Sequence, residues 1–401
     1  MHGILIVGAG QAGASLAEKI RSEGYEGPVT LIGEEPVPPY ERPPLSKAYL
    51  LGETEKERLY LRPENIYADK EIALKLGHPV TAIDTATQTV ALGDDVLVYD
   101  QLALTTGSVP NRLPSAIGGD LEGLYTVRTL ADIDRIEPLF QEGARVLVVG
   151  GGYIGLEAAA VAAKLGLKVT LVEMAERILG RVAASETADV VRAKHLEHGV
   201  DLREGVGLDH LSGDGHVSEA VLSDGSTLAV DFVIVGTGIR PATALAEAAG
   251  IACENGILVD ALGRTSAKGV WAAGDCTSFP YKGGRLRLES VQNAIDQAEA
   301  VATNMLGAGE PYAPYPWFWS DQYDMKLQIA GLNTGYTRVV KRMSAAGQSH
   351  WYFDGDTFLA VDAINAPRDY MIGKRLLEMG KTITPEVAAD GEADLKALLK
   401  S

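Results

Sequence analysis

The sequence predicts an α/β protein built from two Rossmann-like units and a smaller α+β domain towards its C-terminal end. The main observation is an internal repeat, in which an apolar run at residues 4–7 recurs at 146–149 and each run continues into a glycine-rich turn. Uninterrupted apolar runs of this kind are typical of buried parallel strands. The second observation is a change of pattern from residue 319 onward, where short runs separated by turn signals indicate antiparallel strands.

The repeat extends over a strand–turn–helix–strand unit in both copies. Each apolar run ends in a turn with the spacing GxGxxG, and an alanine-rich helix and a second strand are predicted after it. The glycines of the turns are Gly8, Gly10 and Gly13 in the first copy and Gly150, Gly152 and Gly155 in the second. The predicted helices cover residues 14–21 and 156–164, and the predicted second strands cover residues 29–32 and 169–172.

This unit has the chemistry of a dinucleotide site. The first glycine permits a tight turn, the second lets the backbone approach a pyrophosphate, and the third lets the helix pack on the strand. The pyrophosphate then lies at the positive end of the helix, and an acid beyond the second strand accepts hydrogen bonds from a ribose. Glu34 and Glu173 stand at those positions. One GxGxxG alone is weak evidence, because glycine turns also serve packing, but two complete copies predict two bound dinucleotides.

Glu173 indicates which nicotinamide cofactor the second copy prefers. A carboxylate repels a 2′-phosphate and favours the free hydroxyl of NADH, whereas an arginine would favour NADPH. Arg177 and Arg181 follow a few residues later and could counter this preference. NADH is therefore favoured over NADPH.

The composition excludes several other classes of protein. The formal charge of −18 over 401 residues argues against a nucleic-acid partner, which needs a basic surface. The two cysteines, Cys253 and Cys276, form no CxxC pair, which argues against a disulfide scaffold, a zinc site or a dithiol redox centre and favours a reducing cytoplasm. The longest charge-free run is eleven residues, and the apolar run at 4–7 leaves no room for a signal peptide, so a soluble protein with no membrane association is expected.

Further motifs resemble those of one flavoprotein fold. Residues 271–275 read as a strand ending in Gly274 and Asp275, and they resemble the second flavin-binding motif of the glutathione-reductase-like flavoproteins. In that fold the aspartate holds a ribityl hydroxyl. Residues 104–107 and 235–238 resemble the segments where the same fold crosses between its domains. Each motif alone could be ordinary turn chemistry, but their order along the chain implies this fold.

A narrower resemblance covers nearly the whole chain. Several segments are similar to the NADH-dependent ferredoxin reductases that serve bacterial oxygenase systems. These segments are residues 40–50, 150–157, 289–294, 316–322 and 358–362. The similarity runs from residue 3 to about residue 370. The departures are Gln292, where the family often has proline, and Cys276 after the Gly-Asp pair.

The resemblance implies a set of cofactor-binding residues. Those that match FAD contacts are Gly8, Gly10, Ala12, Gly13, Glu34, Lys47, Val80, Arg128, Asp275 and Val291. Those that match positions around NADH are Gly150, Gly152, Ile154, Gly155, Glu157 and Glu173. Arg42, Thr106, Gly238 and Gly274, which lie in the segments described above, complete the expected cofactor-binding set.

The expected chemistry depends on a missing cysteine. Disulfide reductases carry a cysteine in the first domain, whereas residues 36–50 contain none here, so electrons must leave for an external acceptor or oxygen. The resemblance implies that Lys47 pairs with Glu157 beside the reactive edge of the flavin and that Trp319 lies near it on an electron exit route. The alternatives are that Lys47 is a solvated loop lysine, that Glu157 is an exposed acid in the first turns of a helix, and that Trp319 belongs to an aromatic run used for packing.

The expected domains are an FAD-binding domain of residues 1–109 and 244–318, an NADH-binding domain of residues 110–243, and a C-terminal α+β domain of residues 319–401. In the last of these, strands are predicted at 325–331, 337–343, 350–353 and 357–359, and a helix at 367–379. This domain carries no nucleotide motif, so it is expected to be either a dimerisation module or a lid that shapes the partner site.

The predicted function is that of an NADH:ferredoxin oxidoreductase. It contains non-covalent FAD and no metal, and gives single electrons to a [2Fe–2S] ferredoxin that supplies a cytochrome P450 or a Rieske-type dioxygenase. The alternatives are a rubredoxin reductase, an NADH oxidase, or an NADH-sensing flavoprotein similar to apoptosis-inducing factor. A monomer or weak homodimer is expected.

Contact with the ferredoxin is expected to be transient and electrostatic. Ferredoxins are usually acidic, so an acidic reductase needs a local basic patch. The candidate patch consists of Arg285, Arg287, Lys326, Lys341, Arg342, Lys374 and Arg375. The alternative is a scatter of solvated charges.

Overall fold

The computed structural model describes residues 2–345 and 347–400, which form two compact units. The first unit contains the residues up to Glu41, together with Lys56–Val109 and Ile239–Pro314. The second contains Arg42–Glu55, Pro110–Gly238 and the residues from Tyr315 onward. The segment Arg42–Glu55 therefore clusters with the second unit, although it lies within the predicted first FAD segment.

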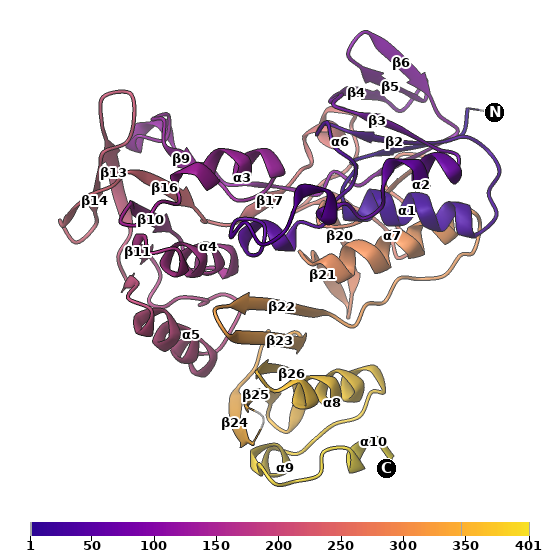
Figure 1. Ribbon diagram of the computed structural model, residues 1–401. Coiled ribbons are helices and arrows are strands. Elements are labelled where there is room, and N and C mark those ends of the chain that lie inside the picture. Colours follow the sequence, from indigo (N-terminus) through magenta and orange to yellow (C-terminus); the bar gives the residue numbers. More distant parts are fainter. Residues whose placement is uncertain (1, 346, 401) are drawn as a thin grey trace. The chain divides into compact units, whose positions relative to one another are not determined.

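The first unit is built on a five-stranded parallel sheet with the strand order β19-β7-β1-β2-β3. Strands β2 and β3 of this sheet are labelled in Figure 1. Its strands are β1 (Ile4–Val7), β2 (Val29–Gly33), β3 (Ile72–Leu76), β7 (Gln101–Leu104) and β19 (Val270–Ala272). Because side chains alternate along a strand, Ile4 and Ile6 enter one core cluster, whereas Leu5 and Val7 enter another. The sheet is thus covered on both faces.

Two helices cover the Ile4 face of this sheet. They are α1 (Gln11–Ser22), which follows the first glycine turn, and α7 (Val291–Met305), which packs against it. Leu16 of α1 and Val301 of α7 are buried in the same cluster as Ile4. The predicted helix at 14–21 is confirmed, with three more residues at its N-terminal end and one at its C-terminal end.

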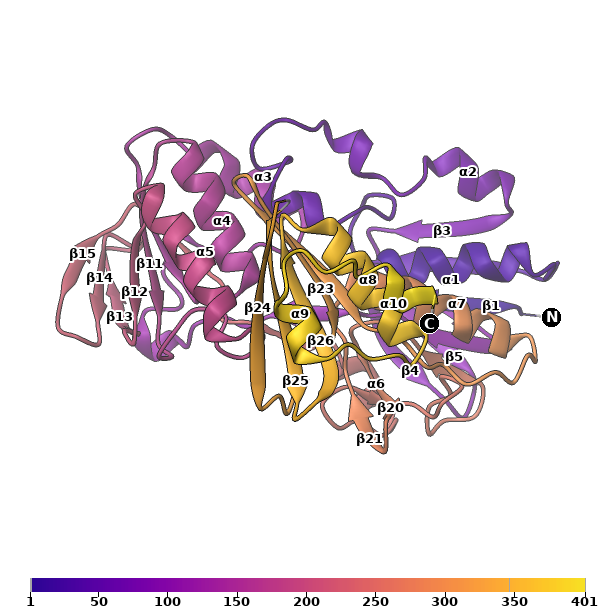
Figure 2. The same ribbon diagram turned by 90° about the horizontal axis from the view of Figure 1, so that it is seen from below.

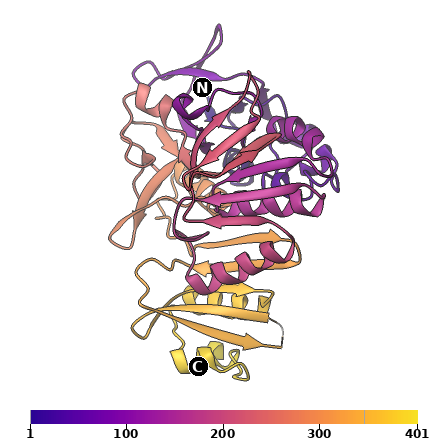
Figure 3. The ribbon, with the colours of Figure 1, turned by 90° about the vertical axis from the view of Figure 1, so that its left-hand side faces the viewer.

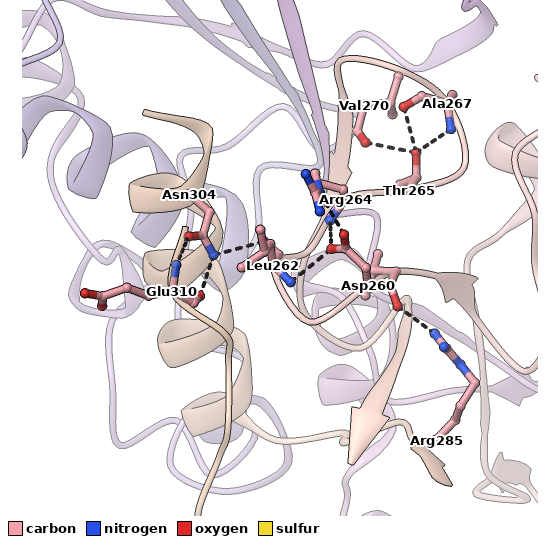
Figure 4. Close-up of polar contacts among 10 residues, drawn as sticks. Asp260, Leu262, Arg264, Thr265, Ala267, Val270, Arg285, Asn304 and Glu310 are labelled. Atoms are coloured by element: carbon pink, nitrogen blue, oxygen red, sulfur yellow. Dashed lines mark hydrogen bonds and ion pairs between the residues drawn. The ribbon is translucent and has the colours of Figure 1, made fainter. Parts of the chain in front are cut away.

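The remaining elements of the first unit surround the sheet. They are α2 (Glu64–Asp69), α6 (Ala244–Ala248), β4 (Val80–Asp84), β5 (Thr89–Leu92), β6 (Asp95–Val98), β18 (Ile257–Leu258), β20 (Thr277–Tyr281), β21 (Gly284–Leu286) and the 3₁₀ helix η2 (Lys56–Leu59). Figure 4 shows how Asn304 of α7 fixes a neighbouring loop: its side-chain amide donates to the Leu262 carbonyl at 3.1 Å and to the Glu310 carbonyl at 2.8 Å. These contacts hold the end of α7 to the segment that precedes β19.

The second unit contains the other repeat. Its parallel sheet has the strand order β12-β11-β10-β16-β9. The strands are β9 (Leu124–Tyr125), β10 (Arg145–Val149), β11 (Lys168–Glu173), β12 (Asp201–Glu204) and β16 (Phe232–Val235). The other elements of this part are α3 (Leu130–Ile136), α4 (Tyr153–Lys164), α5 (Ser185–Glu197), β13 (Leu208–Ser212), β14 (Glu219–Leu222), β15 (Thr227–Ala229) and the 3₁₀ helices η1 (Pro43–Ser46), η3 (Ser115–Ile117) and η4 (Glu137–Leu139). The chain passes from one unit to the other at the short strands β8 (Ser108–Pro110) and β17 (Ile239–Pro241).

The C-terminal part of the second unit is an antiparallel sheet with the strand order β22-β23-β26-β25-β24 (Figure 1). Figures 2 and 3 show this sheet, in orange and yellow, from two other sides. The strands are β22 (Trp317–Gln322), β23 (Met325–Gly331), β24 (Arg338–Ser344), β25 (Gly347–Asp354) and β26 (Thr357–Ile364), and the helices are α8 (Pro367–Glu378), α9 (Pro385–Ala389) and α10 (Ala397–Lys400). The predicted α+β domain is confirmed. The aromatic run at 317–322, which was not predicted as a strand, forms an edge of the sheet. Helix α8 packs on strands β23 and β26 of the sheet, with Tyr370 and Leu376 in the shared core cluster.

Within residues 2–345 and 347–400 there is no helix with the length and apolar character needed to span a membrane.

Candidate functional site

The first glycine turn has two crowded positions and one open position. A Cβ atom on Gly8 would lie 2.2 Å from the Thr105 carbonyl oxygen, and the residue has a φ of +117°. A Cβ atom on Gly13 would lie 2.0 Å from the Gly8 carbonyl oxygen. A Cβ atom on Gly10 would have no atom within 4 Å apart from those of Gly10 itself and its chain neighbours. The fold itself therefore requires the outer glycines, whereas the middle one leaves backbone open to a ligand.

The second turn repeats this geometry. A Cβ atom on Gly150 would lie 2.4 Å from the Gly236 carbonyl oxygen, and one on Gly155 would lie 2.2 Å from the Gly150 carbonyl oxygen. Gly152 again faces open space. Neither α1 nor α4 has a side-chain cap or an acid in its first turn, so the N–H groups at both helix starts are available to an anion.

The acid that follows the second strand differs between the copies. Glu34 follows β2 and is exposed. Glu173 is the last residue of β11, and its carboxylate accepts N–H bonds from Gly151 at 2.7 Å and from Ala175 at 2.8 Å. Each carboxylate oxygen keeps a free lone pair, so Glu173 can also accept from a ribose hydroxyl.

The first unit brings the Gly-Asp motif to the start of α1. A Cβ atom on Gly274 would lie 3.1 Å from Cβ of Ala12, and Gly274 has a φ of +84°. Asp275 accepts a hydrogen bond from Ser108 Oγ at 3.0 Å. Burial raises the pKa of the adjacent Cys276 thiol and so disfavours the reactive thiolate form.

The other predicted cofactor residues lie on several elements. Val80 begins β4 and packs against the core that contains Leu5 and Val7. Val291 begins α7. Thr106 donates from Oγ1 to the Ala242 carbonyl at 2.7 Å and so fixes a crossover.

In the second unit, three predicted residues have distinct environments. Ile154 is exposed at the start of α4, beside the glycine turn. Arg42 donates to the Arg128 carbonyl at 2.5 Å, which ties the segment of η1 to the chain before α3. Gly238 has a φ of +98°, and a Cβ atom there would lie 3.4 Å from the Arg181 guanidinium.

Lys47 and Glu157 form an ion pair. Lys47 Nζ lies 2.7 Å from Glu157 Oε2, and the side chain of Glu157 is only 2% exposed. Ser46 Oγ donates to the same oxygen at 2.6 Å, and Ser320 Oγ donates to Oε1 at 2.7 Å. The alternative of an exposed helical acid is wrong for Glu157. The two serines were missed, since nothing in their local sequence distinguishes them from surface hydroxyls.

Trp319 lies on β22, on the face opposite to Ser320. Its ring centroid is 5.6 Å from that of Trp317, whereas Phe318 lies on the Ser320 face, 4.9 Å from Tyr153. All three aromatic rings of β22 are half-buried. Trp319 is therefore partly accessible and supported by a second indole.

The candidate basic patch needs a correction. Arg342 is buried, and its guanidinium donates to the carbonyls of Asp390 and Gly391 and lies 3.4 Å from Asp369 Oδ2. It is therefore wrong to count Arg342 as a surface charge. Arg285 is turned toward the backbone beside Asp260 and donates to the Val259 carbonyl at 2.8 Å (Figure 4).

Three other members of the patch are paired with acids. Arg287 pairs with Glu289, and Lys374 and Arg375 both pair with Glu378. Lys326 and Lys341 are exposed.

Two glycine turns with open middle positions, each at an uncapped helix start, are the geometry of a protein that binds two dinucleotides. The comparisons with known proteins identify the family. Residues 2–298 match the pyridine nucleotide-disulphide oxidoreductase family, and residues 317–399 match the reductase C-terminal domain. The chain belongs to the pyridine nucleotide-disulphide oxidoreductase family.

Relatives and a solved structure agree along the whole chain. Rhodocoxin reductase of Rhodococcus erythropolis is 41% identical, over 98% of this chain and 93% of that protein. A ferredoxin–NAD(P)+ reductase of Sphingomonas sp is 43% identical, over 96% of this chain and 94% of that protein. The crystal structure of the covalent putidaredoxin reductase–putidaredoxin complex matches with a TM-score of 0.95 and 38% identity, over 99% of this chain and 98% of that chain.

These findings confirm several predictions. The resemblance to ferredoxin reductases is confirmed, as are the fold class, the assignment to flavoprotein oxidoreductases, and FAD and NAD(P)H as the cofactors. The roles of individual site residues stay predictions.

Proposed function

We propose that this protein is an NADH-dependent ferredoxin reductase, which accepts a hydride from NADH and passes single electrons to a [2Fe–2S] ferredoxin. Bound FAD supplies the step from two-electron to one-electron chemistry. The observation that carries the proposal is the combination of two open glycine turns with a segment, residues 36–50, that has no cysteine where disulfide reductases carry one. Cys276 is buried and Cys253 is half-buried, both in a core cluster of the first unit, so electrons have an entrance but no cysteine within residues 36–50 to receive them.

Residues of the first unit would hold FAD. The N–H groups at the start of α1 and the open backbone at Gly10 suit a pyrophosphate, Glu34 suits an adenosine ribose, and Asp275 suits a ribityl hydroxyl. Ser108 supports this role of Asp275 because its hydroxyl fixes one carboxylate oxygen at 3.0 Å.

A pair of glycine variants separates binding from folding. Gly10→Ala is expected to leave the free energy of unfolding of the FAD-free protein within about 1 kcal/mol, because alanine fits the extended backbone and open space. Its affinity for FAD should fall at least ~tenfold, which is about 1.4 kcal/mol. Gly13→Ala, whose Cβ would collide with the Gly8 carbonyl, should instead lower stability itself. Flavin titration and urea unfolding measure the two effects, and an unchanged FAD affinity in Gly10→Ala would refute this assignment.

Residues of the second unit would hold NADH. Gly152 offers open backbone, Ile154 offers an exposed apolar surface, and Glu173 keeps acceptor capacity for a ribose. The Arg177 guanidinium donates to the Ala183 carbonyl at 2.7 Å. Because this guanidinium is already engaged within the protein, it is less able to bind a 2′-phosphate, which supports the preference for NADH over NADPH.

The coenzyme preference can be tested at Glu173. Glu173→Gln is expected to reduce the ratio of kcat/KM for NADH to that for NADPH by about tenfold, because removing the carboxylate charge removes repulsion of a 2′-phosphate. Glu176→Gln, an exposed acid three residues away, is the matched control and should leave the ratio unchanged. Equal ratios in the two variants would show that Glu173 does not determine the preference for NADH over NADPH.

We propose that Lys47 and Glu157 tune the flavin and that Trp319 lies on the electron exit route. A preorganised ammonium stabilises the negative charge of a reduced flavin, and the carboxylate fixes the position of that ammonium through the 2.7 Å contact. The support for Trp319 is its partial exposure and its contact with Trp317, which make a rigid aromatic surface.

The terminal acceptor of the electrons is proposed to be an oxygenase of the P450 or Rieske type, reached through the ferredoxin. We further propose a monomer or weak homodimer that works in the cytoplasm; two free cysteines suit a reducing compartment. Light scattering during gel filtration tests the oligomeric state.

Encounter with the ferredoxin is proposed to be electrostatic and transient. The rate of ferredoxin reduction should fall about tenfold between low and high ionic strength, whereas flavin reduction by NADH should change little. Lys326→Gln combined with Lys341→Gln should flatten this dependence, since both lysines are exposed. A salt-independent rate in the unmodified protein would remove the electrostatic part of the proposal.

Steady-state kinetics with NADH tests the function as a whole. Cytochrome c reduction should require an added [2Fe–2S] ferredoxin. Rapid oxygen consumption without ferredoxin would indicate an NADH oxidase, and a preference for rubredoxin would indicate a rubredoxin reductase. Slow turnover with a long-lived reduced complex would indicate a sensor similar to apoptosis-inducing factor.

A further inference from the structure

A continuous chain of hydrogen bonds leads away from the buried Glu157 carboxylate within the second unit. Gln322 donates from Nε2 to Ser320 Oγ at 3.2 Å, and its Oε1 lies 2.8 Å from His195 Nε2. The other ring nitrogen of His195, Nδ1, lies 3.3 Å from the hydroxyl of Tyr323. Four side chains thus connect Glu157 on α4 with α5 and with the turn between β22 and β23.

The charge at Glu157 determines the direction of every bond in this chain. A carboxylate only accepts, so Ser320 must donate to it and must itself accept from the Gln322 amide NH₂ group. The Gln322 carbonyl oxygen therefore faces His195, whose Nε2 must carry the proton. Nδ1 of a neutral ring is then an acceptor, and the Tyr323 hydroxyl donates to it.

The surroundings of the two outer groups agree with this assignment. Burial lowers the pKa of His195 to about 4, so the ring is neutral and carries one proton near pH 7. Burial raises the pKa of Tyr323, so its hydroxyl stays a donor. Tyr323 is held in place by His198, whose ring stacks on it with centroids 3.7 Å apart.

We propose that Ser320, Gln322 and His195 are positioning residues for the Lys47–Glu157 pair, and that their aligned hydrogen bonds offset the charge of the Glu157 carboxylate. The proposal rests on the proposed role of Lys47 and Glu157 at the flavin. Each bond directs its positive end toward the carboxylate, and aligned hydrogen bonds polarise one another in a buried site. Breaking this series of hydrogen bonds removes the dipoles that offset the charge of the Glu157 carboxylate. The negative electrostatic potential that the carboxylate exerts on the flavin then increases, which disfavours flavin reduction.

The first test uses the ring nitrogens of His195 and needs no turnover. In protein labelled with ¹⁵N-histidine, long-range NMR should show His195 only as the Nε2–H tautomer; His195→Gln assigns the signal. In Ser320→Ala the Gln322 amide is no longer oriented, and a second tautomer should appear. His350→Gln, which removes another buried histidine bonded to Thr187, is the control and should leave His195 unchanged. An Nδ1–H tautomer in the unmodified protein would overturn the proposal.

The second test is the midpoint potential of the bound flavin. Ser320→Ala should lower the ratio of reduced to oxidised flavin at a fixed poise about tenfold, which is about 30 mV for a two-electron couple. Gln322→Leu should lower it about threefold, and His350→Gln should leave it unchanged. A changed tautomer with an unchanged potential would overturn the role at the flavin. Failure to reduce ferredoxin with both results as expected would instead refute the proposed function alone.

Discussion

Glu157→Ala is expected to lower the free energy of unfolding of the second unit by about 3 kcal/mol. Removing one partner of a buried ion pair typically costs about 3–5 kcal/mol, because the other charge stays buried without compensation. The lower end applies here because the Lys47 side chain is 20% exposed. The hydroxyls of Ser46 and Ser320 also lose their acceptor. Three of the four tryptophans lie in this unit, so urea unfolding followed by tryptophan fluorescence measures the effect.

The chain offers a matched control between the same two segments. Glu53, like Lys47, lies in Arg42–Glu55, and it pairs with Lys164 of α4 at 2.9 Å. Both side chains of this second pair are more than half exposed, at 55% and 54%. Glu53→Ala is therefore expected to cost less than about 1 kcal/mol. Equal losses in the two variants would show that burial of Glu157 does not determine the strength of the contact.

The parts of the site that could be predicted are those with a local signal. The two glycine turns were predicted because a steric requirement and a ligand requirement coincide at a fixed spacing. The structure separates these requirements. A side chain in place of Gly13 would collide with the Gly8 carbonyl oxygen, whereas Gly10 faces open space. The Lys47–Glu157 pair came only from the family resemblance, because its partners are far apart in sequence.

The parts that could not be predicted are contacts between distant segments. Ser320, Gln322 and His195 are single polar residues with no recognisable motif around them. Only the packing of β22 against α4 and α5 joins them in one series of hydrogen bonds. Arg342 was misjudged for a related reason. Arginine is usually exposed, but here Asp369 and the carbonyls at residues 390–393 supply a buried site for it.

Acidification is expected to weaken the fold through buried histidines. Burial lowers the pKa of His195 and of His350 from 6.5 to about 4. Below pH 6.5 the unfolded chain takes up these protons while the folded protein does not, so stability falls as the pH drops from 6.5 toward 4. Each histidine contributes about 3 kcal/mol over that window.

Asp362 acts in the opposite direction and makes the prediction specific. Burial raises its pKa from 3.8 to about 6, so between these values the folded protein holds a proton that the unfolded chain lacks. Its contribution grows as the pH falls and offsets one histidine, which leaves a net loss of about 3 kcal/mol. His195→Gln should therefore nearly abolish the loss between pH 6.5 and 4.5, and Asp362→Asn should roughly double it. Urea unfolding across this range measures both slopes; parallel curves for the two variants would show that these groups titrate alike in the folded and unfolded chain.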